Sequence, residues 1–149
     1  MIRTGRRMRL CAALLVLNLA FIWGNSLLPG ETSEAFSDWV KMLLARFFAF
    51  GPDGVGGGGL LRKIAHFSEF ALLGGLLSWL FAMLQKKRHW PFACGFLAAC
   101  VDETIQRFVP DRFPSLFDVG IDTFGVLTGM LVLAIGHSIL FKHPMEERK

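Results

Sequence analysis

The sequence predicts an all-α polytopic membrane protein with four transmembrane helices and an amphipathic helix on the outer surface of the membrane. Its 149 residues are 53% hydrophobic, with a mean hydropathy of +0.48, which is too apolar for an ordinary soluble domain. The apolar residues also gather into runs of about 20 residues, long enough to cross roughly 30 Å of hydrocarbon as helices. The length suits one domain, and we assign residues 1–149 to it.

The first predicted span covers residues 10–28, an uncharged run that follows the basic segment 1–9. A cleaved signal peptide would also begin with basic residues and an apolar stretch. However, the apolar part is long here, and it ends in Asn25, Ser26 and then Pro29-Gly30 without an Ala-x-Ala-like cleavage site. We therefore predict a retained transmembrane helix.

The long connection that follows contains an amphipathic pattern. Between residues 34 and 50, apolar side chains recur at spacings of three and four, and most charged side chains lie elsewhere around the helix. This pattern predicts a helix lying on the outer surface of the membrane that the protein spans. The next segment, 51–59, has six glycines in nine residues, which is typical of a flexible linker.

Three further spans complete the prediction, at residues 64–84, 90–109 and 117–141. The second and third are joined by the short basic turn 85–89, and the third and fourth by PDRFPS at 110–115, whose two prolines favour a loop. In the last span, Gly125 and Gly129 form a small-xxx-small pair that lets a neighbouring helix approach closely.

The basic residues indicate orientation and exclude one class of partner. Ten Lys and Arg residues fall on the side of the two termini and the 85–89 turn, and six fall on the other side. With the positive side inside, both termini are cytoplasmic, and we expect a multi-pass protein of the cytoplasmic (inner) membrane. Because these residues flank apolar runs, the formal charge of +4 indicates topology signals, and we predict membrane lipids rather than nucleic acid as partners.

A polar cluster is predicted near the outer ends of the last three spans. Ionisable residues at membrane depth are costly and mark functional sites. At about 1.5 Å per residue, Glu69 and Asp102 lie about 9 Å from the outer ends of their helices and Asp122 about 6 Å. Spacings of three and four place the polar residues of each helix on one edge. The candidate site comprises nine residues: Lys63, His66, Glu69, Asp102, Glu103, Gln106, Arg112, Asp118 and Asp122.

The segments HFSEFALLG and DETIQRFVPDRFPSLFDVGIDTFGVLTG resemble the VanZ-like family of small bacterial membrane proteins. The resemblance covers about Lys63–Gly129 and extends loosely to Ser26 at the end of the first span, with Phe70 where Tyr is usual and Asp122 where Asn is common. It implies an association with the bacterial cell envelope, and the family's namesake is linked to resistance to the glycopeptide teicoplanin. The resemblance implies no particular reaction.

Three functions are compatible with the cluster. The favoured one is binding of an anionic envelope lipid, precursor or glycopeptide-related ligand by Lys63 and Arg112, because their side chains pair with phosphate or carboxylate. Arg112, on a turn bracketed by prolines, is expected to be the most exposed candidate, at the mouth of the pocket. The alternatives are a membrane-embedded hydrolase or transferase with Glu69 or Glu103 as general base, for which no nucleophile motif is found, and a purely structural network.

A metal site is a weaker possibility. His66 and Glu69 are three residues apart and could ligate a divalent ion together with Asp102, Glu103 or Asp118. Lys63 and Arg112 supply competing positive charge, and the three cysteines lie inside apolar runs, where we expect buried apolar residues rather than ligands or a disulfide. The sequence therefore predicts neither a metal nor another cofactor.

Overall fold

The computed structural model is all-helical over the part of the chain that it describes, residues 2–33, 35, 38–40, 42 and 58–141. Its helices are α1 (Ile2–Ser26), α3 (Gly58–Met83), α4 (His89–Gln106) and α5 (Leu116–Phe141). No strand occurs within these described ranges. The prediction of an all-α fold is confirmed.

The helix bounds follow the predicted spans closely. The largest differences are at the starts of α1 and α3, which begin at Ile2 and Gly58, eight and six residues before the predicted spans. The predicted 110–115 loop lies between the end of α4 at Gln106 and the start of α5 at Leu116. Most of the predicted surface helix at 34–50, and most of the glycine-rich segment after it, lie outside the described residues.

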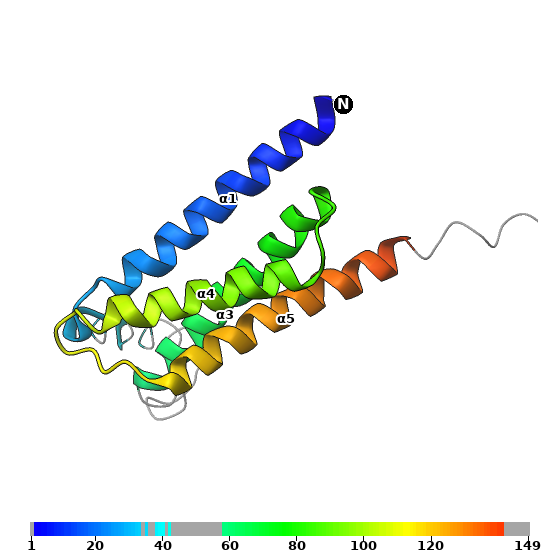
Figure 1. Ribbon diagram of the computed structural model, residues 1–149. Coiled ribbons are helices and arrows are strands. Elements are labelled where there is room, and N and C mark those ends of the chain that lie inside the picture. The colour runs from blue at the N-terminus through cyan, green and yellow to red at the C-terminus, as the bar shows by residue number, and fades with distance from the viewer. Residues whose placement is uncertain (1, 34, 36–37, 41, 43–57, 142–149) are drawn as a thin grey trace, which may run out of the picture.

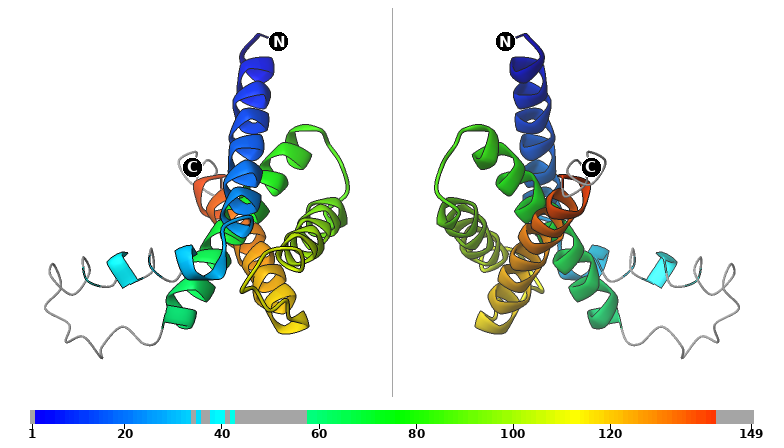
Figure 2. Two further views of the ribbon diagram at one scale, coloured as in Figure 1. Left: turned by 90° about the vertical axis from the view of Figure 1, so that its left-hand side faces the viewer. Right: turned by 90° about the vertical axis from the view of Figure 1, so that its right-hand side faces the viewer.

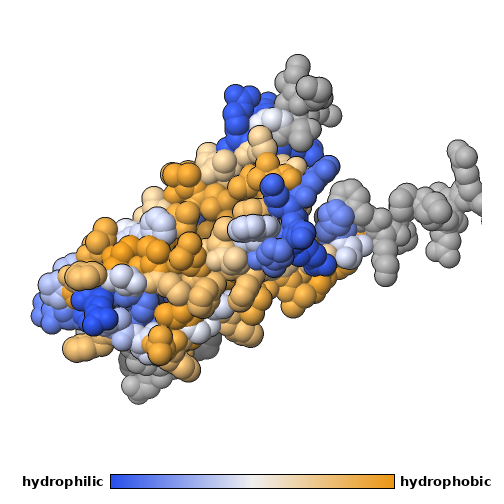
Figure 3. Space-filling view, viewed as in Figure 1, coloured by the Kyte–Doolittle hydropathy of each residue, from blue (hydrophilic) through white to orange (hydrophobic). Residues whose placement is uncertain are grey.

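Three of the described helices are long and apolar enough to cross a membrane. The candidate segments are Gly5–Ser26 in α1, Leu60–Met83 in α3 and Leu116–Ile139 in α5. The predicted fourth crossing, α4, is not among them, because its 18 residues end in a turn that carries Asp102, Glu103 and Gln106. On the face in Figure 3, apolar residues cover the middle of the bundle and hydrophilic residues gather at its ends, as expected for a membrane protein.

The helices run along a common direction with alternating sense (Figure 1). The start of α1, the turn between α3 and α4, and the end of α5 lie at one end of the bundle, and the loop between α4 and α5 lies at the other. In Figure 2, α3 and α5 cross each other near the middle of the bundle, where they pack directly against one another. The described part of α1 packs on α3 and α4, and α4 also packs on α3 and α5.

Glycines let α3 and α5 approach closely. A Cβ at Gly125 would lie 2.6 Å from the carbonyl oxygen of Phe67, and one at Gly129 only 1.8 Å from that of Ala71. A Cβ at Gly74 of α3 would in turn lie 2.1 Å from the carbonyl oxygen of Val126. Since atoms cannot approach so closely, these positions require glycine for the observed packing.

The apolar core lies along the same interface and extends to α1 and α4. Its buried residues are Cys11, Leu15, Ile22, Phe70, Leu73, Leu76, Leu77, Ala98, Ala99 and Val126. All three cysteines are free, as expected. Only Cys11 is buried, whereas Cys94 and Cys100 are half-buried, so the prediction of three buried cysteines is correct for one of them.

Candidate functional site

Asp102 is the centre of the polar cluster, and its side chain has no exposed surface. It projects from the last turns of α4 toward the end of α1, where the hydroxyl of Ser26 donates a 2.7 Å hydrogen bond to Oδ1. The side-chain amide of Gln106, one turn along α4, donates a 2.9 Å hydrogen bond to Oδ2 and lies 3.4 Å from the Ser26 hydroxyl oxygen. These contacts fix the carboxylate and join α1 to α4.

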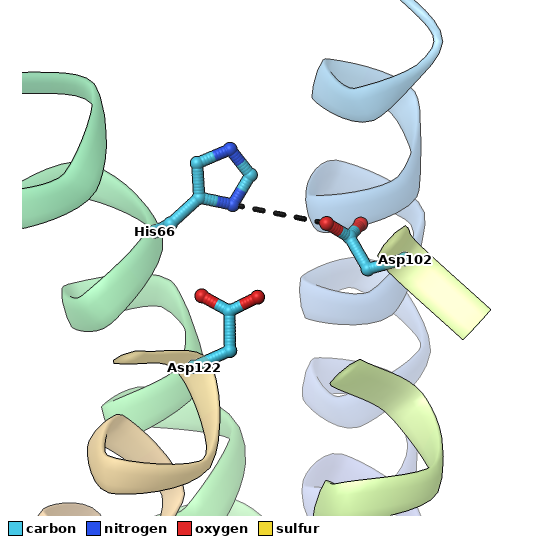
Figure 4. A group of neighbouring side chains, drawn as sticks. All are labelled: His66, Asp102 and Asp122. Carbon is cyan, nitrogen blue, oxygen red and sulfur yellow. Dashed lines mark ion pairs between the residues drawn. The ribbon is translucent and has the colours of Figure 1, made fainter. Parts of the chain in front are cut away.

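His66 of α3 and Asp122 of α5 face Asp102 across the centre of the bundle (Figure 4). The three residues can each place one ligand atom within 4.8 Å of the others. His66 Nδ1 lies 3.9 Å from Asp102 Oδ2, close enough for an ion pair but too far for a hydrogen bond. Asp122 is 3% exposed, so three helices contribute buried or nearly buried ionisable groups to one point.

Lys63 and Asp118 lie nearer the solvent, at the starts of α3 and α5. The Lys63 Nζ is 3.5 Å from Asp118 Oδ1, and the side chains are 41% and 25% exposed. The Lys63 Nζ also lies 4.9 Å from the centre of the Phe117 ring. This pair is more accessible than the buried charged residues of the candidate site, Asp102, Glu103, Arg112 and Asp122.

Arg112 is not the exposed residue that the sequence suggests. It is 6% exposed, and its Nε and Nη2 donate to the backbone carbonyls of Leu28 and Asn25 at 3.1 and 3.2 Å. Carbonyls at the end of a helix lack intrahelical partners and attract cations. The expectation that the Arg112 guanidinium is exposed at the mouth of the pocket is therefore wrong, because Arg112 is buried by its hydrogen bonds to carbonyls at the end of α1.

The two glutamates point to different neighbours. Glu69 Oε1 accepts a 3.1 Å hydrogen bond from the side-chain amide of Asn25 on α1. Glu103 accepts a hydrogen bond from the backbone N–H of Ser115 and faces a groove along the α4–α5 loop. Although Glu103 is adjacent to Asp102 in sequence, it does not share the space between His66 and Asp122.

Two hollows meet at Lys63. One is a polar cavity of about 20 Å³ between α3, α4 and α5, lined by Arg62, Lys63, His66, Gln106, Asp118, Ile121 and Asp122. The other is an open apolar groove of about 600 Å³ along α3 and α5, lined by Lys63, Ile64, Phe67, Leu116, Phe117, Gly120, Ile121 and Phe124. The small cavity has room for about one water molecule, since a water needs roughly 10–15 Å³.

Three residues outside the predicted set take part in the site. Asn25 and Ser26 at the end of α1 contact Glu69 and Asp102, and Arg62 lines the polar cavity. The sequence offered a signal for the first two, because they are the polar residues that end an otherwise apolar run. Arg62 directly precedes the polar edge of α3 and resembles an ordinary flanking residue.

Comparison with protein families gives one match. The family model described as VanZ/LLP1 matches residues 9–139, which is most of the chain and includes all four described helices in large part. No match was found among curated proteins or among solved structures. The family match extends well beyond the segment that carries the sequence motifs.

Proposed function

Because the chain belongs to the VanZ/LLP1 family and has apolar helices of membrane-spanning length, we propose that it binds an anionic amphiphile of the bacterial envelope. The acyl part of this ligand occupies the groove along α3 and α5. Its phosphate or carboxylate head group lies at the mouth of the polar cavity, beside Lys63. Membership of the family supports the proposed setting in the cell envelope, and the geometry around Lys63 supports the proposed position of the head group.

The observation that carries the proposal is the position of Lys63, which lines both the polar cavity and the apolar groove. An amphiphile needs an apolar surface for its chain directly beside a charged group for its head. Phe67 and Phe124, whose ring centres are 5.9 Å apart, provide the apolar surface. Lys63 remains 41% exposed and can contact a phosphate without leaving its position.

The volume of the polar cavity and the charges that line it limit where the head group can lie. The cavity of about 20 Å³ is too small for a phosphorylated head group, whereas the groove of about 600 Å³ accommodates an acyl chain. The carboxylates of Asp118 and Asp122 also line the cavity and would repel an anion placed inside it. The head group therefore lies outside the cavity, on the side of Arg62 and Lys63.

We also propose the topology that such a ligand requires. The cluster faces outward, both termini lie in the cytoplasm, and α4 crosses the inner membrane as a fourth, short span. Its 18 residues measure about 27 Å as a helix, which approaches the hydrocarbon thickness, and its polar last turn is buried against neighbouring helices. The predicted outer-surface helix near residues 34–50 belongs to the same proposal.

Cysteine labelling tests this topology. The three native cysteines are replaced, and single cysteines are introduced at Lys87, between α3 and α4, and at Asp111, between α4 and α5. In sealed spheroplasts, a membrane-impermeant maleimide should label position 111 and should leave position 87 unlabelled until the cytoplasmic membrane is permeabilised. Labelling of position 87 in sealed spheroplasts would reverse the orientation and contradict the proposal.

Lipid binding is tested with the purified protein in detergent. Phosphatidylglycerol serves as the anionic probe and phosphatidylcholine as the zwitterionic reference, with binding followed by native mass spectrometry. Lys63→Gln should weaken phosphatidylglycerol binding about fivefold, since one basic residue at a lipid surface contributes about 1 kcal/mol. Gly120→Leu should also weaken phosphatidylglycerol binding. Gly120 lines the groove and nothing lies within 4 Å of a Cβ there, so a leucine side chain would fit without disturbing the fold and would fill part of the groove.

Matched variants away from the groove provide the controls. Lys87→Gln removes the same charge from the α3–α4 turn, and Gly136→Leu adds the same side chain to α5 where nothing lies within 4 Å of a Cβ. Both should bind phosphatidylglycerol as the parent does. Equal binding by all four variants would contradict the proposed ligand position, and hydrolysis of the bound lipid would instead favour an enzyme.

The cellular role is tested by glycopeptide susceptibility. A clean deletion strain is complemented with the parent, Lys63→Gln or Lys87→Gln, at matched expression. If the ligand site serves envelope resistance, Lys63→Gln should resemble the deletion and Lys87→Gln should resemble the parent. Identical susceptibility of the deletion and the parent would remove glycopeptide resistance from the proposal while leaving the measured lipid binding intact.

A further inference from the structure

We infer that His66, Asp102 and Asp122 bind one divalent first-row transition-metal ion between α3, α4 and α5. The imidazole nitrogen favours such an ion over Mg²⁺ or Ca²⁺, which prefer oxygen ligands. This inference does not depend on the proposed lipid ligand. It departs from the sequence-based expectation of no metal. The weaker metal possibility drawn from the sequence joined His66 and Glu69 with Asp102, Glu103 or Asp118.

The three side chains are close enough to bind one ion. One ligand atom from each lies within 4.8 Å of the others. The distance of 3.9 Å between His66 Nδ1 and Asp102 Oδ2 is too long for a hydrogen bond. It suits two ligands of one ion, because metal–ligand bonds of about 2.1 Å place ligand atoms roughly 3 to 4 Å apart.

Independently of these distances, the surroundings of Asp122 favour a bound cation. Its side chain is 3% exposed, and its carboxylate turns toward His66 and Asp102 (Figure 4). No described residue donates a hydrogen bond to it or forms an ion pair with it, and His66 Nδ1 is likewise buried without a hydrogen bond. A nearly buried carboxylate without a protein partner is destabilising unless a cation, a proton or a bound water compensates it, and a cation in the cavity would do so while also using His66 Nδ1.

The space that Asp122 and His66 line is of the size of a single ion. A cavity of about 20 Å³ accepts one ion or one water molecule and excludes larger ligands. Three protein ligands would leave further coordination positions of the ion open. These positions face the cavity, where water or the oxygen of an anion could complete the coordination.

The surroundings of Asp102 match those of a metal ligand. The Ser26 hydroxyl and the Gln106 amide each donate to one of its oxygens, at 2.7 and 2.9 Å, and each oxygen retains acceptor capacity for a metal. Such hydrogen bonds to the second side of a ligand fix its orientation. The contacts therefore hold the Asp102 carboxylate in place before an ion arrives.

Two of the neighbouring cations have contacts of their own, whereas Arg62 lines the cavity together with His66 and Asp122. Lys63 Nζ lies 3.5 Å from Asp118, and Arg112 donates to the backbone carbonyls of Asn25 and Leu28. The sequence alone presents both as competitors for the acidic residues. In the folded chain, these contacts account for Lys63 Nζ and for two of the Arg112 nitrogens, so the competition is weaker than the sequence implies.

The test uses the full chain purified in detergent, stripped with a chelator and then titrated with Zn²⁺ in the absence of added lipid. The parent should retain one Zn²⁺ per chain after desalting, measured by elemental mass spectrometry. At a free Zn²⁺ concentration of about one hundred times Kd, the Tm of the parent should be about 5 °C or more above that of the stripped parent. Asp122→Asn and His66→Gln should each weaken Zn²⁺ binding at least tenfold.

Asp111→Asn is the matched control, since it removes the same charge from the exposed α4–α5 loop at a residue with a φ of 57°, which Asn tolerates. It should bind Zn²⁺ as the parent does. The stripped Asp122→Asn protein should be at least as stable as the stripped parent, because the substitution removes an unpaired buried charge. Absence of Zn²⁺ binding by the parent, or undiminished binding by both Asp122→Asn and His66→Gln, would overturn the site.

Discussion

The interface between α3 and α5 and the interface between α1 and α4 hold the bundle together in different ways. The first is a backbone contact, with Gly125 and Gly129 of α5 against Phe67 and Ala71 of α3. The second depends on side-chain hydrogen bonds, above all that from Ser26 to Asp102. In lipid, where burial of apolar surface hardly favours helix association, close packing and polar contacts are the two available means.

The α3–α5 and α1–α4 interfaces together position the candidate site. The rigid α3–α5 pair fixes His66 and Asp122 relative to each other, while α4 brings Asp102 across and the end of α1 holds it in place. The site thus lies where the close-packed interface meets the hydrogen-bonded one. Damage to the first should unfold the bundle, whereas damage to the second should loosen one side of it.

The largest effect is expected from Gly129→Leu. A Cβ at this position would lie 1.8 Å from the Ala71 carbonyl oxygen, so α3 and α5 must separate. We expect a loss of about 3 kcal/mol or more, from overpacking, and little monodisperse protein on size-exclusion chromatography. Gly136→Leu on the same helix, with nothing within 4 Å of a Cβ, should behave as the parent does. Equal stability of the two variants would mean that the close α3–α5 contact does not hold the bundle.

The next effect is expected from Arg112→Ala. The substitution leaves the carbonyls of Asn25 and Leu28 without these donors, which should cost about 2 kcal/mol in the free energy of unfolding. Arg112→Lys should recover only part of this loss, because Lys lacks the planar fork of donors. Arg107→Ala, at an exposed position, is the control in thermal unfolding. A stable Arg112→Ala protein with lost function would restore the sequence-based view of Arg112 as a ligand-binding residue.

A smaller effect is expected from Ser26→Ala. It removes the 2.7 Å hydrogen bond to Asp102 and should cost about 1.5 kcal/mol, in the range for hydrogen bonds to charged groups. Ser138→Ala removes only a local bond to the Ala134 carbonyl on an exposed turn of α5 and should cost less than about 0.5 kcal/mol. Thermal unfolding in one detergent compares the two. Similar costs would show that the α1–α4 hydrogen bond contributes nothing specific.

The smallest effect on stability is expected from Lys63→Gln. Its ion pair with Asp118 is partly exposed, and such pairs contribute about 0–1 kcal/mol. The Tm should therefore remain close to that of the parent, even though phosphatidylglycerol binding decreases. This combination distinguishes a ligand site from a structural network. A large drop in Tm would place Lys63 among the residues that hold the helices together.

Much of the fold follows from the sequence alone. Apolar runs with polar ends determine α1, α3 and α5, and the prolines of 110–115 determine the loop after α4. These features depend on local composition, so a sequence read alone contains them. The spacing of Asp118 and Asp122, or of Lys63, His66 and Glu69, likewise places polar residues on one edge of each helix.

Only the tertiary structure decided which of these polar edges share a space. Sequence spacing could not exclude Glu103 from the cavity, because its turn toward the Ser115 backbone depends on the path of the α4–α5 loop. Nor could it bury Arg112, whose partners are carbonyls more than eighty residues away at the end of α1. The convergence of His66, Asp102 and Asp122 depends on the distance between α3 and α5, which the glycine contacts set. Helical periodicity is a local property of the chain, whereas the neighbours of a buried side chain are fixed by packing between segments far apart in sequence.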